Sequence, residues 1–96
     1  MAEIISIGAG TVDILIKSEN FKVEDGQLVL PYSTKTEVSA SLISSGGGAS
    51  NSAAGFSRLG LKAACIARLG DDQLGQLVID DLKKEGVETE WLVQKA

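Results

Sequence analysis

Residues 46–53 read Gly-Gly-Gly-Ala-Ser-Asn-Ser-Ala, and further glycines follow at Gly60 and Gly70 with apolar segments between them. A run of glycines followed by small residues predicts a tight turn that leads into a helix. The apolar residues 61–69 then predict a buried strand. At such a turn the backbone can approach a ligand closely, because no side chain stands in the way.

The helix after this turn has recognisable ends. Ser50 or Asn51 can cap its start, because a side-chain oxygen there can accept from a free backbone amide. The helix then extends through Leu59, and Gly60 offers the left-handed residue that commonly ends a helix.

The flanking segments predict an α/β arrangement. Residues 4–7 read Ile-Ile-Ser-Ile, a β-branched run that suits a first, buried parallel strand. Asp71 or Asp72 can cap a second helix with its apolar residues on one face, and Gly86 ends it. Trp91 opens a final apolar segment and is expected to pack on a strand there.

Between the first strand and the glycine turn, the pattern is that of a small separate sheet. Apolar runs at residues 21–23 and 28–30 flank Asp25-Gly26, a strong signal for a β-hairpin that Pro31 closes. Residues 36–43 roughly alternate polar and apolar side chains, which predicts a half-exposed strand.

Composition limits the possible functions. The 96 residues include nine basic and thirteen acidic side chains, a net charge of −4 that argues against nucleic acid or an anionic membrane as a partner. No apolar run approaches the roughly 20 residues that span a bilayer, and a cytoplasmic protein is the simplest expectation. Cys65 is the one cysteine and is expected to be buried, so it forms neither a disulfide framework nor a zinc cluster. The absence of histidine excludes a Ser-His-Asp triad and a histidine metal site.

Five residues are candidates for binding a ligand. Asp13 is expected just past the first strand, where α/β sheets bind ligands, and its carboxylate could accept two hydroxyl hydrogen bonds; a solvated turn aspartate is the alternative. Asn51 carries a donor and an acceptor, and a purely capping role is its alternative. Gly46, Gly47 and Gly48 would bring backbone amides to the ligand, unless they form only a flexible linker or a strand end.

A second glycine segment, Gly8-Ala9-Gly10, carries little information. A dinucleotide fingerprint would require a third glycine where Asp13 stands, so a nucleotide-dependent oxidoreductase rests on Gly8-x-Gly10 alone.

The spacing of the glycine turn resembles the first signature of the ribokinase-like sugar kinases, also called the phosphofructokinase-B family. That signature has a Gly-Gly pair, an asparagine shortly after it and glycines at set distances downstream, here Gly46 and Gly47 or Gly47 and Gly48, then Ala49, Asn51, Ala53, Gly60 and Gly70. The resemblance implies an α/β, ribokinase-like (Rossmann-like three-layer) fold. It implies that residues 1–96 are the N-terminal part of one such domain, with residues 17–42 as a small β lid and the C-terminal nucleotide-binding half absent.

The same resemblance implies a function. A family member transfers the γ-phosphoryl group of ATP, with Mg²⁺, to a hydroxyl of a sugar or nucleoside, and Asp13, the Gly46–Gly48 turn and Asn51 would hold the acceptor. The family's catalytic Gly-Ala-Gly-Asp segment is missing, because Thr11 stands where Gly8-Ala9-Gly10 would require the aspartate. We therefore expect no catalytic residue, no metal ligand, no bound ATP or Mg²⁺ and no phosphoryl transfer for this chain alone.

The resemblance leaves three points open. A lysine commonly stands at the position of Gly48 in ribokinases, so ribose is in doubt as the acceptor. Family lids often form dimer contacts, which makes a homodimer through the lid possible. The alternative function is a non-catalytic binding or assembly module that uses exposed lid strands and an unpaired sheet edge.

Overall fold

The computed structural model describes residues 1–95, and these divide into two compact units. We call residues 1–13 together with those from 44 onward the core unit, and residues 14–43 the ribbon unit. Two strands, β2 (Thr11–Lys17) and β5 (Ala40–Gly46), pair with each other and have residues in both units.

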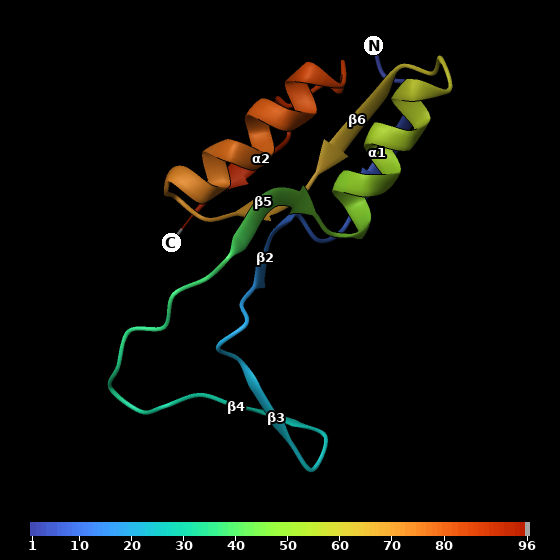
Figure 1. Ribbon diagram of the computed structural model, residues 1–96. Coiled ribbons are helices and arrows are strands. Elements are labelled where there is room, and N and C mark those ends of the chain that lie inside the picture. Colours follow the sequence, from blue (N-terminus) through green and yellow to red (C-terminus); the bar gives the residue numbers. More distant parts are fainter. Residues whose placement is uncertain (96) are drawn as a thin grey trace. The chain divides into compact units, whose positions relative to one another are not determined.

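The core unit is built on parallel strands. Strand β1 (Ile4–Ile7) pairs in parallel with β6 (Ala63–Ile66), and β7 (Arg68–Leu69) pairs in parallel with β8 (Val93–Gln94). Figure 1 shows β6 running beside the first helix, α1. The predicted first parallel strand is therefore confirmed.

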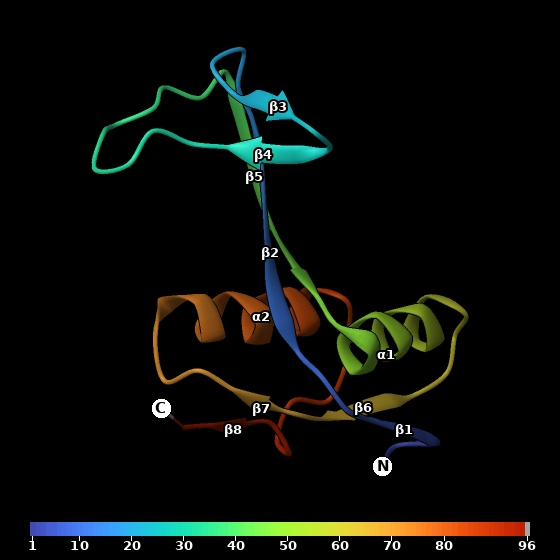
Figure 2. The same ribbon diagram turned by 90° about the horizontal axis from the view of Figure 1, so that it is seen from below.

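Two helices cover one face of these strands. They are α1 (Gly48–Arg58) and α2 (Gln73–Lys84), and Figure 2 shows both on the same side of β6 and β7. Along β1, Ser6 is buried while Ile5 and Ile7 are 51% and 75% exposed, because alternate side chains of a strand point to opposite faces. The strand was predicted to be buried. Among the described residues, its side chains are covered only on the face that the helices occupy.

The apolar core lies between the helices and the strands. Small residues let α1 approach the sheet, and larger ones from α2 fill the remaining space. Its buried members are Ala49, Ala53, Cys65, Ala67, Leu69, Val78, Leu82 and Val87. The burial of Cys65 agrees with the sequence prediction, and burial also raises the pKa of its thiol.

The predicted helix ends are confirmed at three of four positions. Gly60 and Gly86 follow the two helices with φ values of 94° and 79°, in the left-handed region that favours glycine. Asp72 is the N-cap of α2, and its Oδ1 accepts a hydrogen bond from the Gly75 amide at 2.8 Å. The start of α1 is different and is described with the site below.

Two predictions about the later strands are wrong. The apolar segment 61–69 is not one strand, because β6 and β7 are separated at Ala67. The Ala67 carbonyl accepts from the Val93 amide, so the chain changes pairing partner at that residue. Trp91 lies in a turn before β8 and is 54% exposed, so it is not a packed strand residue.

The ribbon unit contains the predicted hairpin. Strands β3 (Lys22–Glu24) and β4 (Gln27–Val29) are antiparallel, and Asp25 and Gly26 join them with φ values of 50° and 75°. Positive φ at both central residues is the mark of a type I′ turn, which explains why Asp-Gly predicts this hairpin. The predicted strand over 36–43 is shifted, because β5 begins at Ala40 and continues to Gly46.

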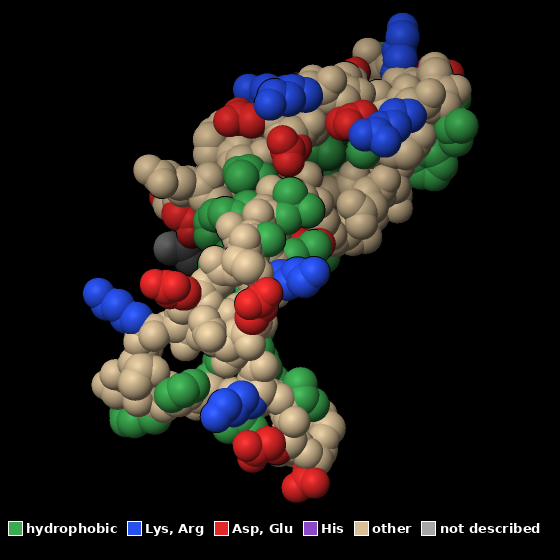
Figure 3. All heavy atoms as spheres, in the orientation of Figure 1, with side chains coloured by type: hydrophobic (Ala, Val, Ile, Leu, Met, Phe, Trp, Pro, Cys, Tyr) green, Lys and Arg blue, Asp and Glu red, His purple; other side chains and the backbone are tan. Residues whose placement is uncertain are grey.

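The surface in Figure 3 mixes charges of both signs, and hydrophobic side chains also reach it at the β3–β4 hairpin. None of the helices in residues 1–95 is long and apolar enough to cross a membrane.

Candidate functional site

The glycine turn joins β5 to α1, and each of its three glycines is placed differently. Gly46 is the buried last residue of β5, Gly47 is the N-cap of α1, and Gly48 is the first residue of the helix. Gly47 has a φ of 93°, and a Cβ there would lie 2.5 Å from the Ala9 carbonyl oxygen. Only glycine fits this position without strain. A Cβ on Gly48 would meet nothing within 4 Å.

Asp13 lies beside this turn. It follows β1, as predicted, and is an exposed residue within β2, so the alternative of a turn aspartate is wrong. A Cβ on Gly46 would stand 2.6 Å from the Asp13 Oδ2 atom. The missing side chain of Gly46 therefore makes room for the carboxylate, and the two residues form one surface.

The start of α1 is capped from a distant part of the chain. The predicted cap by Ser50 or Asn51 is wrong, because the helix begins at Gly48 and its N-cap, Gly47, has no side chain to offer. Instead, the Ala9 carbonyl accepts from the amides of Ala49, at 3.0 Å, and Ser50, at 3.5 Å. Any ligand contact with the first turn would thus rest on the amides of Gly47 and Gly48.

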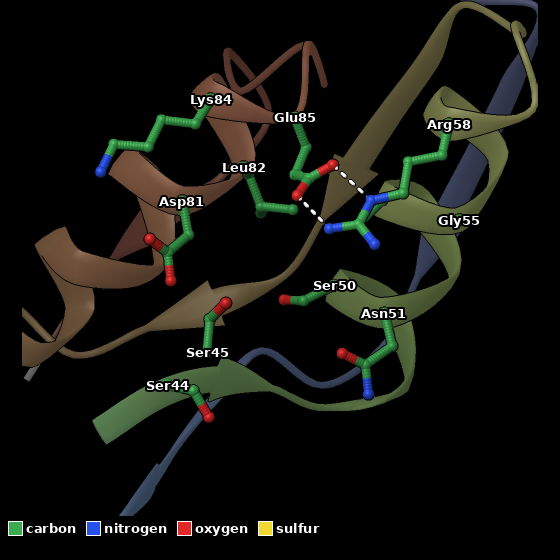
Figure 4. Close-up of a pocket in the computed structure, with 11 residues that line it drawn as sticks. Ser44, Ser45, Ser50, Asn51, Gly55, Arg58, Asp81, Leu82, Lys84 and Glu85 are labelled. Carbon is green, nitrogen blue, oxygen red and sulfur yellow. Dashed lines mark hydrogen bonds and ion pairs between the residues drawn. The ribbon is translucent and has the colours of Figure 1, made fainter. Parts of the chain in front are cut away.

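Asn51 lies one helical turn after the N-cap. Its backbone amide donates to the Gly47 carbonyl at 2.9 Å, as a residue inside a helix does. Its side chain is exposed and borders a groove between α1 and α2, next to Ser44 and Ser45 of β5 (Figure 4). Asn51 is therefore free of the capping role and can offer both its donor and its acceptor to a ligand.

An ion pair closes the other end of that groove. Arg58 near the end of α1 donates from Nε to the Glu85 Oε2 at 2.7 Å and from Nη2 to Oε1 (Figure 4). This bidentate bond holds the pKa of Glu85 below and that of Arg58 above their usual values. Ser57 Oγ also donates to the Glu85 carbonyl. Together these bonds tie the last turn of α1 to the C-cap of α2.

Two features of the site were missed by reasoning from the sequence, and only one of them has a signal there. The capping carbonyl of Ala9 is a backbone group 39 residues before Gly48, where the helix begins, and no side-chain pattern could reveal it. Ser50, by contrast, stands between Ala49 and Ala53 on the buried stripe of α1, with 2% of its surface exposed. A serine on a stripe of alanines is a visible signal.

The turn, Asp13 and Asn51 carry donors and acceptors that can bind hydroxyl groups. Within residues 1–95 no three or more side chains among histidine, cysteine, aspartate and glutamate are grouped so that they could hold a metal ion. The geometry therefore fits recognition of a polar small molecule.

The whole chain is similar to one family of known proteins. The sequence matches the family described as pfkB family carbohydrate kinase over residues 1–96. It is similar to the ribokinase of Bacillus subtilis, with 29% identity over 92 residues that cover 96% of this chain and 29% of that enzyme. The chain thus spans less than a third of the length of the curated relatives that it matches.

Solved structures show the same fold. The Arabidopsis thaliana ribokinase complexed with ribose and ATP superposes with a TM-score of 0.78 at 21% identity, covering 97% of this chain and 28% of that one. The Salmonella enterica aminoimidazole riboside kinase, complexed with aminoimidazole riboside and an ATP analogue, gives a TM-score of 0.70 at 24% identity, covering 97% of this chain and 25% of that one. The predicted α/β, ribokinase-like fold is confirmed.

Proposed function

The chain belongs to the pfkB family of carbohydrate kinases, and on that premise we propose that it forms the acceptor-binding part of a sugar or nucleoside kinase. The complete enzyme would transfer the γ-phosphoryl group of ATP to an acceptor hydroxyl, with Mg²⁺. The family match favours this function over a non-catalytic assembly module. A cytoplasmic location stays a prediction from the sequence.

One observation carries the proposal: the Asp13 carboxylate lies against Gly46, at the turn where α1 begins. A carboxylate is an acceptor with about four lone-pair sites, so it can bind two neighbouring hydroxyls of a sugar. A side chain on Gly48 would meet nothing within 4 Å, so there is room for a ring at the start of α1. Asn51, on the same helix, would add a donor and an acceptor for a further hydroxyl.

The nucleotide and its metal belong to the complete enzyme in this proposal. Within residues 1–95 no three or more potential metal ligands are grouped, so these residues do not fit a resident Mg²⁺ site, and the proposal assigns phosphoryl transfer to other parts of the enzyme. We expect no ATP-dependent sugar phosphorylation from the 96-residue chain. Turnover by the pure chain in a coupled ADP assay would refute this expectation.

The ribbon unit, which spans residues 14–43 and contains the predicted lid 17–42, is proposed as that lid and as a possible homodimer contact. Its apolar side chains are exposed on consecutive residues such as Ile14, Leu15 and Ile16, so both faces of this strand need a cover. Sedimentation of the chain with Ile16→Ser against the parent chain would show whether a dimer depends on this surface.

Acceptor binding can be tested directly by isotope-edited NMR titration. D-ribose and aminoimidazole riboside, the acceptors named with the two solved structures, are suitable probes. Asp13→Asn should weaken binding by about tenfold or more, because it removes a charge-assisted hydrogen bond. Asp71→Asn, which alters an exposed aspartate outside the site, is the matched control and should bind as the parent chain does. Equal weakening by both variants would contradict a role for Asp13.

Gly48 offers a test of acceptor choice. A side chain there would meet nothing within 4 Å, so Gly48→Lys should fold normally. Since ribokinases commonly carry lysine at this position, the variant should bind D-ribose more tightly than the parent chain does. Unchanged or weaker ribose binding in a folded variant would argue against Gly48 as a determinant of specificity.

A further inference from the structure

The groove between α1 and α2 has a volume of about 470 Å³, within the range of small-molecule sites. Figure 4 shows side chains from β5, α1 and α2 converging on it. Most of the residues that line it have polar side chains, and the full lining is Ser44, Ser45, Ser50, Asn51, Ala54, Gly55, Arg58, Asp81, Leu82, Lys84 and Glu85. Asp13, which carries the proposed acceptor site, is not part of it.

Ser50 marks this groove as more than a surface depression. Only 2% of Ser50 is exposed, and its Oγ makes no hydrogen bond with any group in residues 1–95. In Figure 4 its hydroxyl points into the space between Ser45 and Glu85. A buried hydroxyl without a partner costs roughly 1–3 kcal/mol, so a group that enters the groove and bonds to it would be favoured.

The charges around the groove exclude a simple ionic ligand. Arg58 and Lys84 are balanced by Asp81 and Glu85, and the Arg58 guanidinium is already held by Glu85. Neither an anion nor a cation therefore meets an excess of opposite charge. The hydroxyls of Ser44, Ser45 and Ser50 and the amide of Asn51 can each both donate and accept, which matches a ligand with several hydroxyl groups.

The apolar part of the lining fits the same class of ligand. Ala54, Gly55 and Leu82 contribute a small surface without hydrogen-bonding side chains. The C–H face of a sugar ring can lie on such a surface while its hydroxyls reach the polar wall.

We propose that the groove between α1 and α2 binds a neutral, polyhydroxylated molecule of sugar or polyol type, with one hydroxyl bonded to the buried Ser50 Oγ. This is a second site, separate from the acceptor position at Asp13. Asn51 borders the groove and belongs to the proposed acceptor site as well, so a ligand in the groove can influence acceptor binding through this one side chain.

The test is an NMR titration of the chain with D-glucose and, separately, with glycerol as neutral probes. Saturable shifts are expected at the amides of Ser45, Ser50 and Leu82. Ser50→Ala should weaken binding about tenfold, because one buried hydrogen bond is lost. Ser52→Ala is the matched control on the same helix: Ser52 is exposed, its Oγ donates to the Gly48 carbonyl at 2.7 Å, and binding should be unchanged.

A thermal measurement separates the proposal from a purely structural role of Ser50. Without sugar, Ser50→Ala should melt no lower than the parent chain, and sugar should raise the melting temperature of the parent chain only. A lower melting temperature for Ser50→Ala together with no effect of sugar on either protein would mean that water already satisfies the hydroxyl, and would overturn the proposal. Ser45→Ala, at the groove mouth, serves as a second variant if Ser50→Ala does not fold.

Two further results distinguish the groove from the acceptor site and a neutral ligand from a charged one. In Asp13→Asn the groove shifts should persist, so the groove and the acceptor site can fail independently. Shifts confined to residues around Asp13 and Gly46 would overturn the groove proposal while leaving the acceptor site intact. Binding of D-glucose 6-phosphate at the groove as tightly as D-glucose would contradict the neutral-ligand assignment.

Discussion

The two units of this chain use apolar residues in opposite ways. All the buried apolar side chains of residues 1–95 lie in the core unit, where α1 and α2 cover one face of β1, β6 and β7. In the ribbon unit, Ile16, Leu28 and Leu42 remain 50–59% exposed although they are no less hydrophobic. Hydrophobicity decides which residues seek cover, but a layer of helices must be present to provide it.

The largest effect should come from truncating a core side chain. Leu82→Ala removes a fully buried side chain and should lower the free energy of unfolding by about 2–5 kcal/mol. Leu28→Ala in the ribbon unit should change it by less than about 0.5 kcal/mol, because that side chain is already exposed. Urea unfolding of both variants measures the difference. Comparable losses would mean that the ribbon unit has a core of its own.

Two of the glycines with positive φ, Gly47 in the core unit and Gly26 in the ribbon unit, should show the next largest difference. Gly47→Ala should cost about 2–4 kcal/mol, since it combines a disfavoured φ with a clash against the Ala9 carbonyl. Gly26→Ala in the hairpin should cost about 1–2 kcal/mol, because its φ is also positive but nothing lies within 4 Å of the added Cβ. Calorimetric melting gives the order, and a reversed order would show that the Ala9 contact yields easily.

Removal of a side-chain hydrogen bond to the backbone should give a smaller difference in stability between the two units. Asp72→Ala removes the N-cap of α2 and should cost about 1 kcal/mol. In the ribbon unit, Ser18 Oγ donates to the Glu37 carbonyl in an exposed bond, and Ser18→Ala should cost less than about 0.5 kcal/mol. Chemical denaturation at pH 7 compares the two, and an equal cost would place the Ser18 bond among the supports of the fold.

The smallest effect should come from the Arg58–Glu85 ion pair. Because the hydrogen bond from Arg58 lowers the pKa of Glu85 in the folded chain, the pair stabilises the fold above the ordinary glutamate pKa of about 4.3. This contribution is lost as the pH falls through the lower pKa of the folded state. Glu85→Gln should therefore shift the urea midpoint slightly downward at pH 7 and not at pH 2, whereas Glu90→Gln, at an exposed site, should do neither. A shift that persists at pH 2 would implicate packing rather than charge.

The local signals in the sequence predicted much of this fold. Asp25-Gly26 forms the turn it predicts, Asp72 caps α2, and Gly60 and Gly86 follow their helices with positive φ. Each of these positions depends on the conformation of one or two residues and their nearest neighbours. Such preferences act in the same way in any fold, so a pattern of a few letters is enough to find them.

The predictions that failed depended on distant partners. Ser50 and Asn51 have the right chemistry for a helix cap, yet the Ala9 carbonyl takes that role from another part of the chain. The strand over 61–69 breaks at Ala67 because the Val93 amide bonds there. Asp13 follows β1 as predicted, but the sequence did not reveal that it lies within a further strand, β2, whose partner β5 is more than twenty residues away.

The same distinction between local signals and distant partners applies to the candidate site. Its residue types, an aspartate, three glycines and an asparagine, were readable from the sequence, and their joint role in binding an acceptor stays a proposal. Only the tertiary structure set Asp13 against Gly46 and left the buried Ser50 hydroxyl, beside the groove, without a partner in residues 1–95.

The sequence by itself determined the turn, three of the four helix ends and the family, because these follow from local backbone preferences and from the spacing of glycines. The tertiary structure decided which polar groups meet and which remain unpaired, because that depends on contacts between segments that the order of residues does not place side by side.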